Sequence, residues 1–348
     1  APVPDRSLVQ LSGEDSVKFL QGLITNHMST IATGGSGFNA AFLTPQGRLL
    51  ADIFIYPRND GVTFPRPVFL IDGPATERDA ILAHLRKYKL RAKVNIEPVD
   101  AYAVWSAWGP GTAQLWWRHH SIHDAEAVRW PAGRLIKTTE VGFAAIGMED
   151  CRASGMGYRF ILPRDEPVKL PADYTELSAD DYTTWRILRG VAEGIDDFVP
   201  GQSLPLECNL DYMHGVDFRK GCYVGQELTI RTYHKGVVRK RILPVQLLPA
   251  STPPEQWSSM PFHRCTHALP MPGMDMQLRQ SSEAVANGRS RRSPARLCSV
   301  SRTLNVALAL LRLEHVQEGQ VFRVAAAADA ASDVEWLARP WIPSWWPK

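Results

Sequence analysis

The stretch RKGCYVGQE, residues 219–227, contains a single cysteine with basic residues directly before it. Cys222 follows Arg219 and Lys220, and positive charge favours a thiolate over a thiol. A helix predicted from about Gly225 to Tyr233 would bring its N-terminus close to the same sulfur and act in the same direction. Cys222 is therefore the cysteine best suited to act as a nucleophile or as a metal ligand.

The neighbours of Cys222 have predictable supporting roles. Gly221 and Gly225 permit close backbone approaches that a side chain would block, so we expect a tight loop at the surface. Gln226 and Glu227 would occupy the first helical turn, where the helix dipole favours a carboxylate. The same local sequence is equally compatible with a buried structural cysteine on a strand-to-helix turn.

Size and composition indicate a globular protein of two or three domains. The chain has 348 residues, of which 45% are hydrophobic and 22% are charged. Its net charge of +3 is too small to indicate a nucleic-acid partner, and no apolar run approaches the roughly 20 residues of a membrane helix. Five dispersed cysteines without a CxxC pair favour a reducing compartment. The chain begins with Ala1 and shows no leader sequence, so we expect a processed or trimmed form.

Antiparallel strands and helices alternate through most of the chain, which predicts an α+β fold. The expected elements are a strand and a helix in 7–26, two strands in 38–61 around Pro45-Gln46-Gly47, a helix after Pro74, a mixed segment at 100–170 and a helix at 181–194. The pattern becomes strand-like from 237 onward, and we place the domain boundary near residue 246.

A polar, Ser/Arg-rich segment at 278–296 lacks apolar periodicity, so we expect an exposed or disordered insertion around 263–303. Its arginines are Arg289, Arg291, Arg292 and Arg296. They raise the hypothesis of an RNA or membrane adaptor, although a solvated loop is the simpler interpretation.

The octet KGCYVGQE, with LECNLDYMHGVDF before it and LTIRTYHKGVVRKRILPV after it, resembles the signature of the YgfZ-type folate-binding family. This family is related to the aminomethyltransferase, or T-protein, of the glycine cleavage system. Four further stretches resemble it in the same order, so the likeness covers most of residues 7–316. They are LSGEDSVKFLQGLITN, AAFLTPQGRLLADIFIY, LRKYKLRAKVNIEP and NVALALLRLEH.

The resemblance implies a T-protein-like, three-part α+β fold around a central hole. Residues 1–245 would form an aminomethyltransferase-like folate-binding region of two intertwined subdomains. Residues 246–348 would form a C-terminal β-barrel-like domain that carries the insertion. The mitochondrial members assemble iron–sulfur clusters, so the resemblance also implies a mitochondrial-matrix factor that promotes maturation of [4Fe–4S] proteins with an A-type scaffold protein.

A tetrahydrofolate site would need an aromatic wall, a carboxylate and bases for the glutamate tail. The candidates are Trp185, Tyr212 or Tyr223 for the wall, Glu193 for the carboxylate, and Arg231 and Arg239 for the tail. A tetrahydrofolate-dependent one-carbon transferase is therefore the second functional hypothesis.

Two departures from the T-protein argue against that chemistry. Val191 of this chain stands at the position where the T-protein's Arg-x-Glu-Ala-Gly pattern has its glutamate. Glu193 lies two residues further on. The nearest counterparts in this chain of the T-protein's catalytic aspartate are Asp72 and Asp79. An active aminomethyltransferase is therefore not expected.

A single cysteine cannot hold an iron–sulfur cluster, because a [2Fe–2S] unit needs about four ligands. The resemblance to cluster assembly factors therefore implies a cluster shared between Cys222 and a partner protein. Cys208, fourteen residues upstream, could be a second ligand, but we expect it to serve packing.

Three further stretches have simpler interpretations. RHHSIHD supplies His119, His120, His123 and Asp124 without a second ligand cluster, which favours a surface turn. GGSG at 34–37 lacks the context of a phosphate loop. The tryptophan-rich C-terminus is expected to pack on the β domain.

Overall fold

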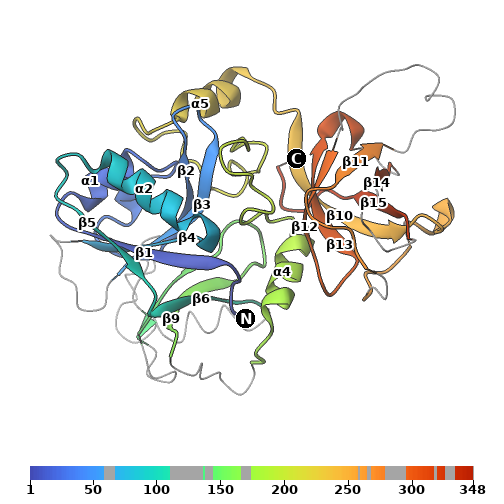
Figure 1. Ribbon diagram of the computed structural model, residues 1–348, viewed down its shortest axis with the longest axis horizontal. Helices are drawn as coiled ribbons and strands as arrows, with labels where there is room; N and C mark the ends of the chain where they lie inside the picture. Colours follow the sequence, from blue (N-terminus) through green and yellow to red (C-terminus); the bar gives the residue numbers. More distant parts are fainter. Residues whose placement is uncertain are drawn as a thin grey trace.

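The computed structural model describes residues 1–58, 67–109, 136–137, 144–165, 174–257, 259–264, 268–278, 295–316, 320–325 and 334–347. Figure 1 shows two sheets and their helices on one side and a β-barrel on the other. The predicted α+β class is confirmed by this mixture of antiparallel sheets and helices. None of the described helices combines the length and the apolar character that crossing a membrane requires.

The N-terminal sheet is antiparallel, with the strand order β2-β3-β4-β1-β5 among the described residues. Its strands are β1 (Arg6–Ser12), β2 (Phe38–Leu43), β3 (Leu49–Pro57), β4 (Val68–Pro74) and β5 (Asn95–Val99). The predicted turn between β2 and β3 is closed by a 2.9 Å hydrogen bond from Gly47 N to Thr44 O.

Both faces of this sheet are buried, as the alternation of side chains along β3 shows. Ile53 and Ile55 join the core beneath α1 (Ser16–Gln21) and α2 (Arg78–Lys89). Phe54 and Tyr56 point to the opposite core, because successive side chains of a strand alternate between faces. The sheet therefore separates a helix-covered core from a central core.

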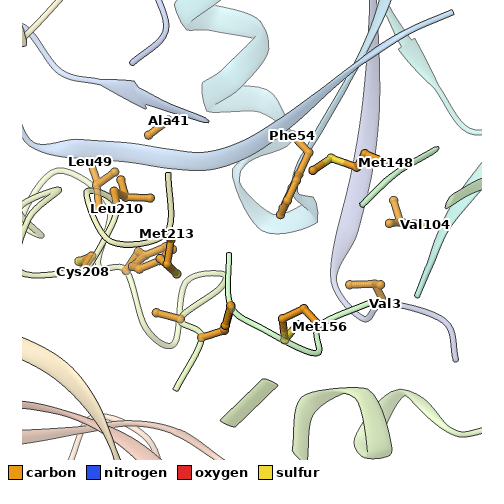
Figure 2. Packing of buried hydrophobic residues seen from close by; sticks show 14 of the residues in the cluster. Val3, Ala41, Leu49, Phe54, Val104, Met148, Met156, Cys208, Leu210 and Met213 are labelled. Carbon is orange, nitrogen blue, oxygen red and sulfur yellow. The ribbon is translucent and has the colours of Figure 1, made fainter. Parts of the chain in front are cut away.

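The central core is closed by a second sheet and by α4 (Ala179–Leu188). The described strands of that sheet are β6 (Tyr102–Ala107), β7 (Ile136–Lys137), β8 (Ala144–Glu149) and β9 (Tyr158–Pro163), in the order β6-β9-β8-β7. Figure 2 shows Phe54 beside Met148 of β8, with Val104 and Val3 in the same core. This core also contains Leu308 of the barrel, so it joins all three parts of the fold.

The helix predicted at 181–194 is shorter than expected. α4 begins after Ser178, whose side chain forms a capping box with Asp181, and it ends at Leu188. Gly190 then adopts a φ of +70°, which takes the chain out of the helix. Val191 is buried but lies beyond the helix, so the predicted C-terminal half of this element is wrong.

Six strands in the described part of the C-terminal region form a closed barrel. They are β10 (Lys240–Pro249), β11 (Asp275–Leu278), β12 (Ala295–Val300), β13 (Val306–Arg312), β14 (Phe322–Val324) and β15 (Trp336–Pro340). The barrel closes because β15 pairs with β10. The boundary expected near residue 246 falls within β10.

Part of the segment expected to be a disordered insertion belongs to the barrel. β11 and β12 both lie within 263–303, and their Met276 and Leu297 are buried in the barrel interior. For these strands the expectation of disorder is wrong, because apolar side chains from both fill the core. Residues 279–294, including Arg289, Arg291 and Arg292, lie outside the described residues, as do His119, His120, His123 and Asp124.

The remaining described helices are α5 (Gln226–Lys235) and the short 3-10 helices η1 (Met28–Thr30), η2 (Ala75–Glu77), η3 (Pro254–Gln256) and η5 (Leu313–His315). In Figure 1, α5 lies above β2 and β3, and the chain leaves it to enter the barrel at β10.

The tryptophan-rich C-terminus packs across two parts of the fold and not on the barrel alone. Trp346 packs against the barrel core, and its ring also meets that of Tyr212 at 5.3 Å. Trp345 Nε1 donates to Arg189 O, just after α4, at 2.7 Å. The last residues therefore tie the barrel to the region that precedes it.

A buried histidine predicts how the fold responds to acid. His84 of α2 lies between the rings of Phe42 and Tyr88, and its Nε2 is buried without a hydrogen-bond partner among the described residues. Burial, assisted by the charge of Lys87, lowers the pKa of His84 to about 4. The side chain is therefore neutral in the folded protein at neutral pH.

We expect the free energy of unfolding to fall as the pH is lowered from about 6.5 towards 4, because the unfolded state then binds a proton at His84 that the folded state does not. Between pH 6.5 and 5, the unchanged protein should lose about 1 kcal/mol more stability than the His84→Phe variant does. Denaturant unfolding of both proteins across this range measures the difference. Equal slopes of stability against pH would contradict this role for His84.

Candidate functional site

The motif residues lie in a loop that leads directly into α5. Cys222 is exposed, and within the described ranges its sulfur has no hydrogen-bond partner. The alternative of a buried structural cysteine is therefore wrong for this residue. α5 starts after Gly225, so the predicted helix after the cysteine is confirmed.

Lys220 does not face outward as a charge beside the thiol. It is 9% exposed, and its Nζ donates to the carbonyl oxygens of Gln21, Ile24 and Asn26 at 2.8, 2.5 and 2.9 Å. Gln21 is the last residue of α1, and Ile24 and Asn26 follow it, so the ammonium fixes the motif loop to the end of that helix. Burial lowers the pKa of Lys220 to about 8, against the smaller effect of Asp217. Lys220 therefore has an anchoring contact that the sequence did not predict, and its expected support of a thiolate stays a prediction.

Gly225 fixes the other end of the loop. Its φ is +79°, and a Cβ at this position would lie 2.3 Å from Thr44 O and 3.2 Å from Gly47 Cα. Gly47 has the same φ, and a Cβ there would lie 2.8 Å from Gly225 O. The β2–β3 turn and the start of α5 therefore touch through two glycine backbones, and a side chain at either position would separate them.

The other motif residues have unequal structural importance. Gln226 Oε1 accepts a 3.2 Å hydrogen bond from Tyr223 N, which closes the turn before α5. The ring of Tyr223 is buried, and its centroid lies 4.7 Å from Lys220 Nζ. The hydroxyl of Tyr223 has no hydrogen-bond partner among the described residues. Arg219 and Glu227 are exposed, and a Cβ on Gly221 would meet nothing within 4 Å.

The other described cysteines do not join Cys222. Cys208 and Cys298 are buried in the central core, and burial raises the pKa of both thiols. Cys151 is exposed, but partial burial together with Glu149 and Asp150 raises the pKa of its thiol to about 11. No group of three or more His, Cys, Asp or Glu residues suited to a metal ion occurs among the described residues, and Cys265 lies outside them.

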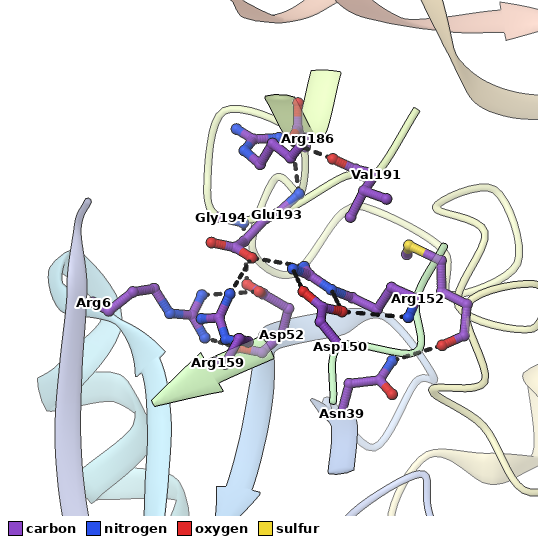
Figure 3. Close-up of polar contacts among 12 residues, drawn as sticks. Arg6, Asn39, Asp52, Asp150, Arg152, Arg159, Arg186, Val191, Glu193 and Gly194 are labelled. Atoms are coloured by element: carbon purple, nitrogen blue, oxygen red, sulfur yellow. Dashed lines mark hydrogen bonds and ion pairs between the residues drawn. The ribbon is translucent and has the colours of Figure 1, made fainter. Parts of the chain in front are cut away.

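A buried ionic network occupies the meeting point of the two sheets (Figure 3). Arg6 of β1 donates to Asp52 of β3 and Asp72 of β4 at 2.9 and 2.5 Å. Arg159 of β9 bridges Asp72 and Glu193, both at 2.9 Å. These side chains are at most 7% exposed, so the pairs are largely removed from water.

Glu193 is the hub of this network on the side of α4. Its Oε2 accepts hydrogen bonds from Arg152, Arg159 and Tyr182 at 2.6, 2.9 and 2.9 Å. Burial alone would raise the pKa of Glu193, but the charges of Arg159 and Arg152 hold it well below its usual range. Glu193 is therefore a charged structural acceptor in this structure.

The barrel joins the same network through Asp197. Asp197 Oδ2 accepts from Arg186 Nη1 at 2.6 Å and from Glu193 N at 2.8 Å. Its Oδ1 accepts from the backbone of Ser299 in β12 at 2.9 Å, and Arg186 donates to the Ser299 hydroxyl at 2.7 Å. One carboxylate thus connects α4, the segment after it and the barrel.

The candidate folate residues occupy several different environments. Trp185 stacks on Trp108 with ring centroids 5.8 Å apart, and Glu193 lies in the ionic network. Tyr212 packs 3.7 Å from the guanidinium of Arg241, beside Trp346. Arg231 and Arg239 are exposed on and after α5. A folate pocket formed by these residues therefore stays a prediction.

The candidates for a catalytic aspartate also differ from each other. Asp72 is fully buried between Arg6 and Arg159, whereas Asp79 is exposed on α2.

Sequence reasoning overlooked the ionic network and the Gly47 contact. A signal for the network was present, because Asp52, Asp72 and Arg159 each interrupt an otherwise apolar strand. A charge at the centre of such a strand must find a partner or remain in water. The partner of Gly225 had no comparable signal, since 178 residues separate the two glycines.

Comparison with known proteins connects this geometry to a family. Residues 239–348 match the family described as CAF17, C-terminal beta-barrel domain. A protein of Mycosarcoma maydis named iron-sulfur cluster assembly factor IBA57 homolog, mitochondrial, is 38% identical, and the alignment covers 100% of this chain and 84% of that protein. A protein of the same name from Neosartorya fischeri is 36% identical over 99% of this chain and 81% of its own length. The chain belongs to the IBA57 family of mitochondrial iron–sulfur cluster assembly factors.

The expected fold, family and mitochondrial location are thereby confirmed. The glycine cleavage system aminomethyltransferase T from Bartonella henselae aligns with a TM-score of 0.61 over 98% of this chain and 84% of that one. Its sequence identity is 13%, so the likeness extends to the fold alone. This IBA57-family chain therefore carries its exposed cysteine on a transferase-like scaffold.

Replacement of Gly225 by Ala should lower the free energy of unfolding by about 2 kcal/mol, because the new methyl group meets Thr44 O in a backbone conformation that disfavours side chains. Gly221→Ala is the matched control, with open space around its Cβ, and should change stability by less than about 0.5 kcal/mol. Denaturant midpoints of the two variants provide the comparison. Equal losses would disprove the glycine contact.

Replacement of Lys220 by Met should cost about 2 kcal/mol, since one buried and two partly buried carbonyls lose their donor. The control Arg219→Met alters an exposed side chain next to it and should be nearly neutral. Hydrogen exchange should show faster exchange of the Val224 amide, which donates to Gly22 O, only in the Lys220 variant. Unchanged exchange in that variant would disprove the anchoring role.

Proposed function

We propose that this protein promotes maturation of [4Fe–4S] proteins in the mitochondrial matrix by binding a [2Fe–2S] cluster jointly with an A-type scaffold protein. Cys222 supplies one thiolate from this chain, and the partner supplies the remaining ligands. The observation that carries the proposal is an exposed cysteine on a loop fixed at both ends.

The number of available ligands supports a shared cluster. A [2Fe–2S] unit needs about four protein ligands. The described residues offer no group of three metal-binding side chains, and the buried Cys208 and Cys298 belong to a packed core. Ligands from a second protein satisfy the cluster without any rearrangement of that core.

The anchoring of the loop supports a defined docking geometry. Lys220 holds the loop to α1, and Gly225 holds it to the β2–β3 turn, with Cys222 between these two contacts. A ligand held in place before binding loses less conformational entropy when the cluster is bound. The thiol gives up its proton on metal binding, so complex formation should weaken as the pH falls.

We do not extend the proposal to one-carbon transfer. The carboxylate of Glu193 already accepts three hydrogen bonds, and Asp72 is paired with two arginines. Recruitment of either group to a substrate would leave buried guanidinium groups without partners, which costs several kcal/mol. The cluster proposal requires no such change.

The decisive experiment mixes the protein anaerobically with a fungal mitochondrial A-type scaffold that carries a [2Fe–2S] cluster. The unchanged protein should give an altered visible absorption spectrum and a coloured complex that elutes as one species. Cys222→Ser should abolish both, because the serine hydroxyl is a poor ligand for iron in such clusters.

Cys151→Ser is the matched control, since it removes the other exposed cysteine among the described residues. Its thiol pKa of about 11 disfavours the thiolate, so this variant should behave as the unchanged protein does. Identical spectra for the unchanged protein and Cys222→Ser would reject Cys222 as a ligand. Titration with tetrahydrofolate would then be the next measurement.

A further inference from the structure

The exposed basic residues of α5 and its flanking loops form a surface beside the Cys222 loop. We propose that this surface docks an acidic surface surrounding the cluster thiolates of the partner protein. The inference rests on the proposed function and adds the chemistry by which the partner is recognised. The α5 basic surface consists of Arg219, Arg231, Lys235 and Arg239.

Helix geometry places the central members of this surface together. Arg231 and Lys235 are both exposed and are four residues apart, so they lie on one face of α5. Thr229, two residues before Arg231, lies on the other side of the helix and is buried. The basic face is therefore directed away from the body of the protein.

A ring contact brings the motif loop to the C-terminal half of the helix. Phe218 stacks on Tyr233 with ring centroids 3.6 Å apart and an interplanar angle of 13°. Arg219 follows Phe218 directly, so its backbone lies beside the last turn of α5. Arg239 is exposed four residues beyond Lys235. Figure 1 shows α5 at the edge of the molecule, clear of the barrel.

The charge of this surface is not neutralised by its surroundings. None of its four cations forms an ion pair with a residue in the described ranges. Two acids lie nearby: Glu227 is exposed in the first turn of α5, and Asp217 accepts a 2.7 Å hydrogen bond from the backbone of Arg219. Four cations against two carboxylates leave a net positive surface next to the thiol.

This charge suits the proposed cargo. A thiolate-ligated [2Fe–2S] cluster is anionic, because its sulfides and thiolates carry more negative charge than its ferric ions carry positive charge. A positive surface around the fourth ligand position lowers the energy of bringing this anion close. Acidic side chains on the partner around the cluster would extend the attraction and orient the encounter.

The surface also has an aromatic component that suits a protein partner. Tyr233 is 50% exposed even though its ring stacks on Phe218, and Val237 is 77% exposed two residues beyond α5. A held aromatic ring beside cations provides contact area with little loss of side-chain freedom. These features suit a folded acidic protein as the partner.

Charge reversal on α5 tests the inference. In the double variant Arg231→Glu, Lys235→Glu, we expect association with the [2Fe–2S]-loaded scaffold to slow by about tenfold or more at low salt. The difference from the unchanged protein should shrink at high salt, because salt screens exposed charges. Stopped-flow absorbance gives the rate, and thermal unfolding confirms that the variant is folded.

The control variant Arg164→Glu, Arg302→Glu makes the same change in net charge elsewhere. Arg164 follows β9, and Arg302 pairs with Asp180 at the start of α4, two elements on the opposite side of the molecule from α5 in Figure 1. Both side chains are exposed. At the same low salt, this control should slow association much less than the α5 variant does, since its charges lie far from the proposed docking surface.

The possible outcomes separate this inference from the proposed function. Equal rates for the unchanged protein and the α5 variant would overturn the docking surface while leaving shared ligation intact. If the α5 variant alone slows and Cys222→Ser still gives the same coloured complex, docking stands and the proposed ligand fails. If the α5 variant loses binding to phosphatidylserine vesicles or RNA but associates normally with the scaffold, the surface has another partner and the inference is wrong.

Discussion

The fold depends on burying several arginine–carboxylate pairs at the junction of its three parts. Arg159 is fully buried and reaches Asp72 of the first sheet and Glu193 beyond α4. Removing charges from water is expensive, so each group needs its partners held in place by the surrounding structure. The position of each part is therefore specified by the others, and Asp197 extends this dependence to the barrel.

The motif loop uses the same principle on a smaller scale. The ammonium of Lys220 has three N–H donors, and three carbonyls at and just beyond the end of α1 accept them. Together with the glycine contact, this arrangement fixes the backbone on both sides of Cys222 while the thiol itself stays exposed. The scaffold is rigid where the loop is attached and accessible where chemistry is proposed.

The sequence predicted those features that depend on local chemistry or on a distinctive motif. The exposed loop that carries Cys222, the start of α5 and the strand–turn–strand of β2 and β3 follow from residue types within short windows. The anchoring role of Lys220 could not be predicted, because its acceptors lie about 200 residues away along the chain. The electrostatic role expected for Lys220 stays a prediction, because it depends on the charge of Lys220 and not on its contacts.

Long-range packing explains the other differences. α4 stops early because Gly190 turns the chain away, although the apolar spacing alone would continue the helix. β11 and β12 interrupt a polar stretch with a few apolar residues, too few for a clear alternating pattern. Both segments form strands because neighbouring barrel strands pair with their backbones: β11 pairs with β12 and β14, and β12 also pairs with β13.

The contacts of the C-terminal tail affect the order in which the chain can complete its fold. Trp345 donates to Arg189 O, and the ring of Trp346 meets that of Tyr212, so residues synthesised after the barrel strands finish a surface of the first region. Until Trp345 and Trp346 have been synthesised, the carbonyl of Arg189 and the ring of Tyr212 lack these contacts. A nascent chain can form its N-terminal sheets early, but it gains this attachment between the first region and the barrel only after Trp345 and Trp346 have been synthesised.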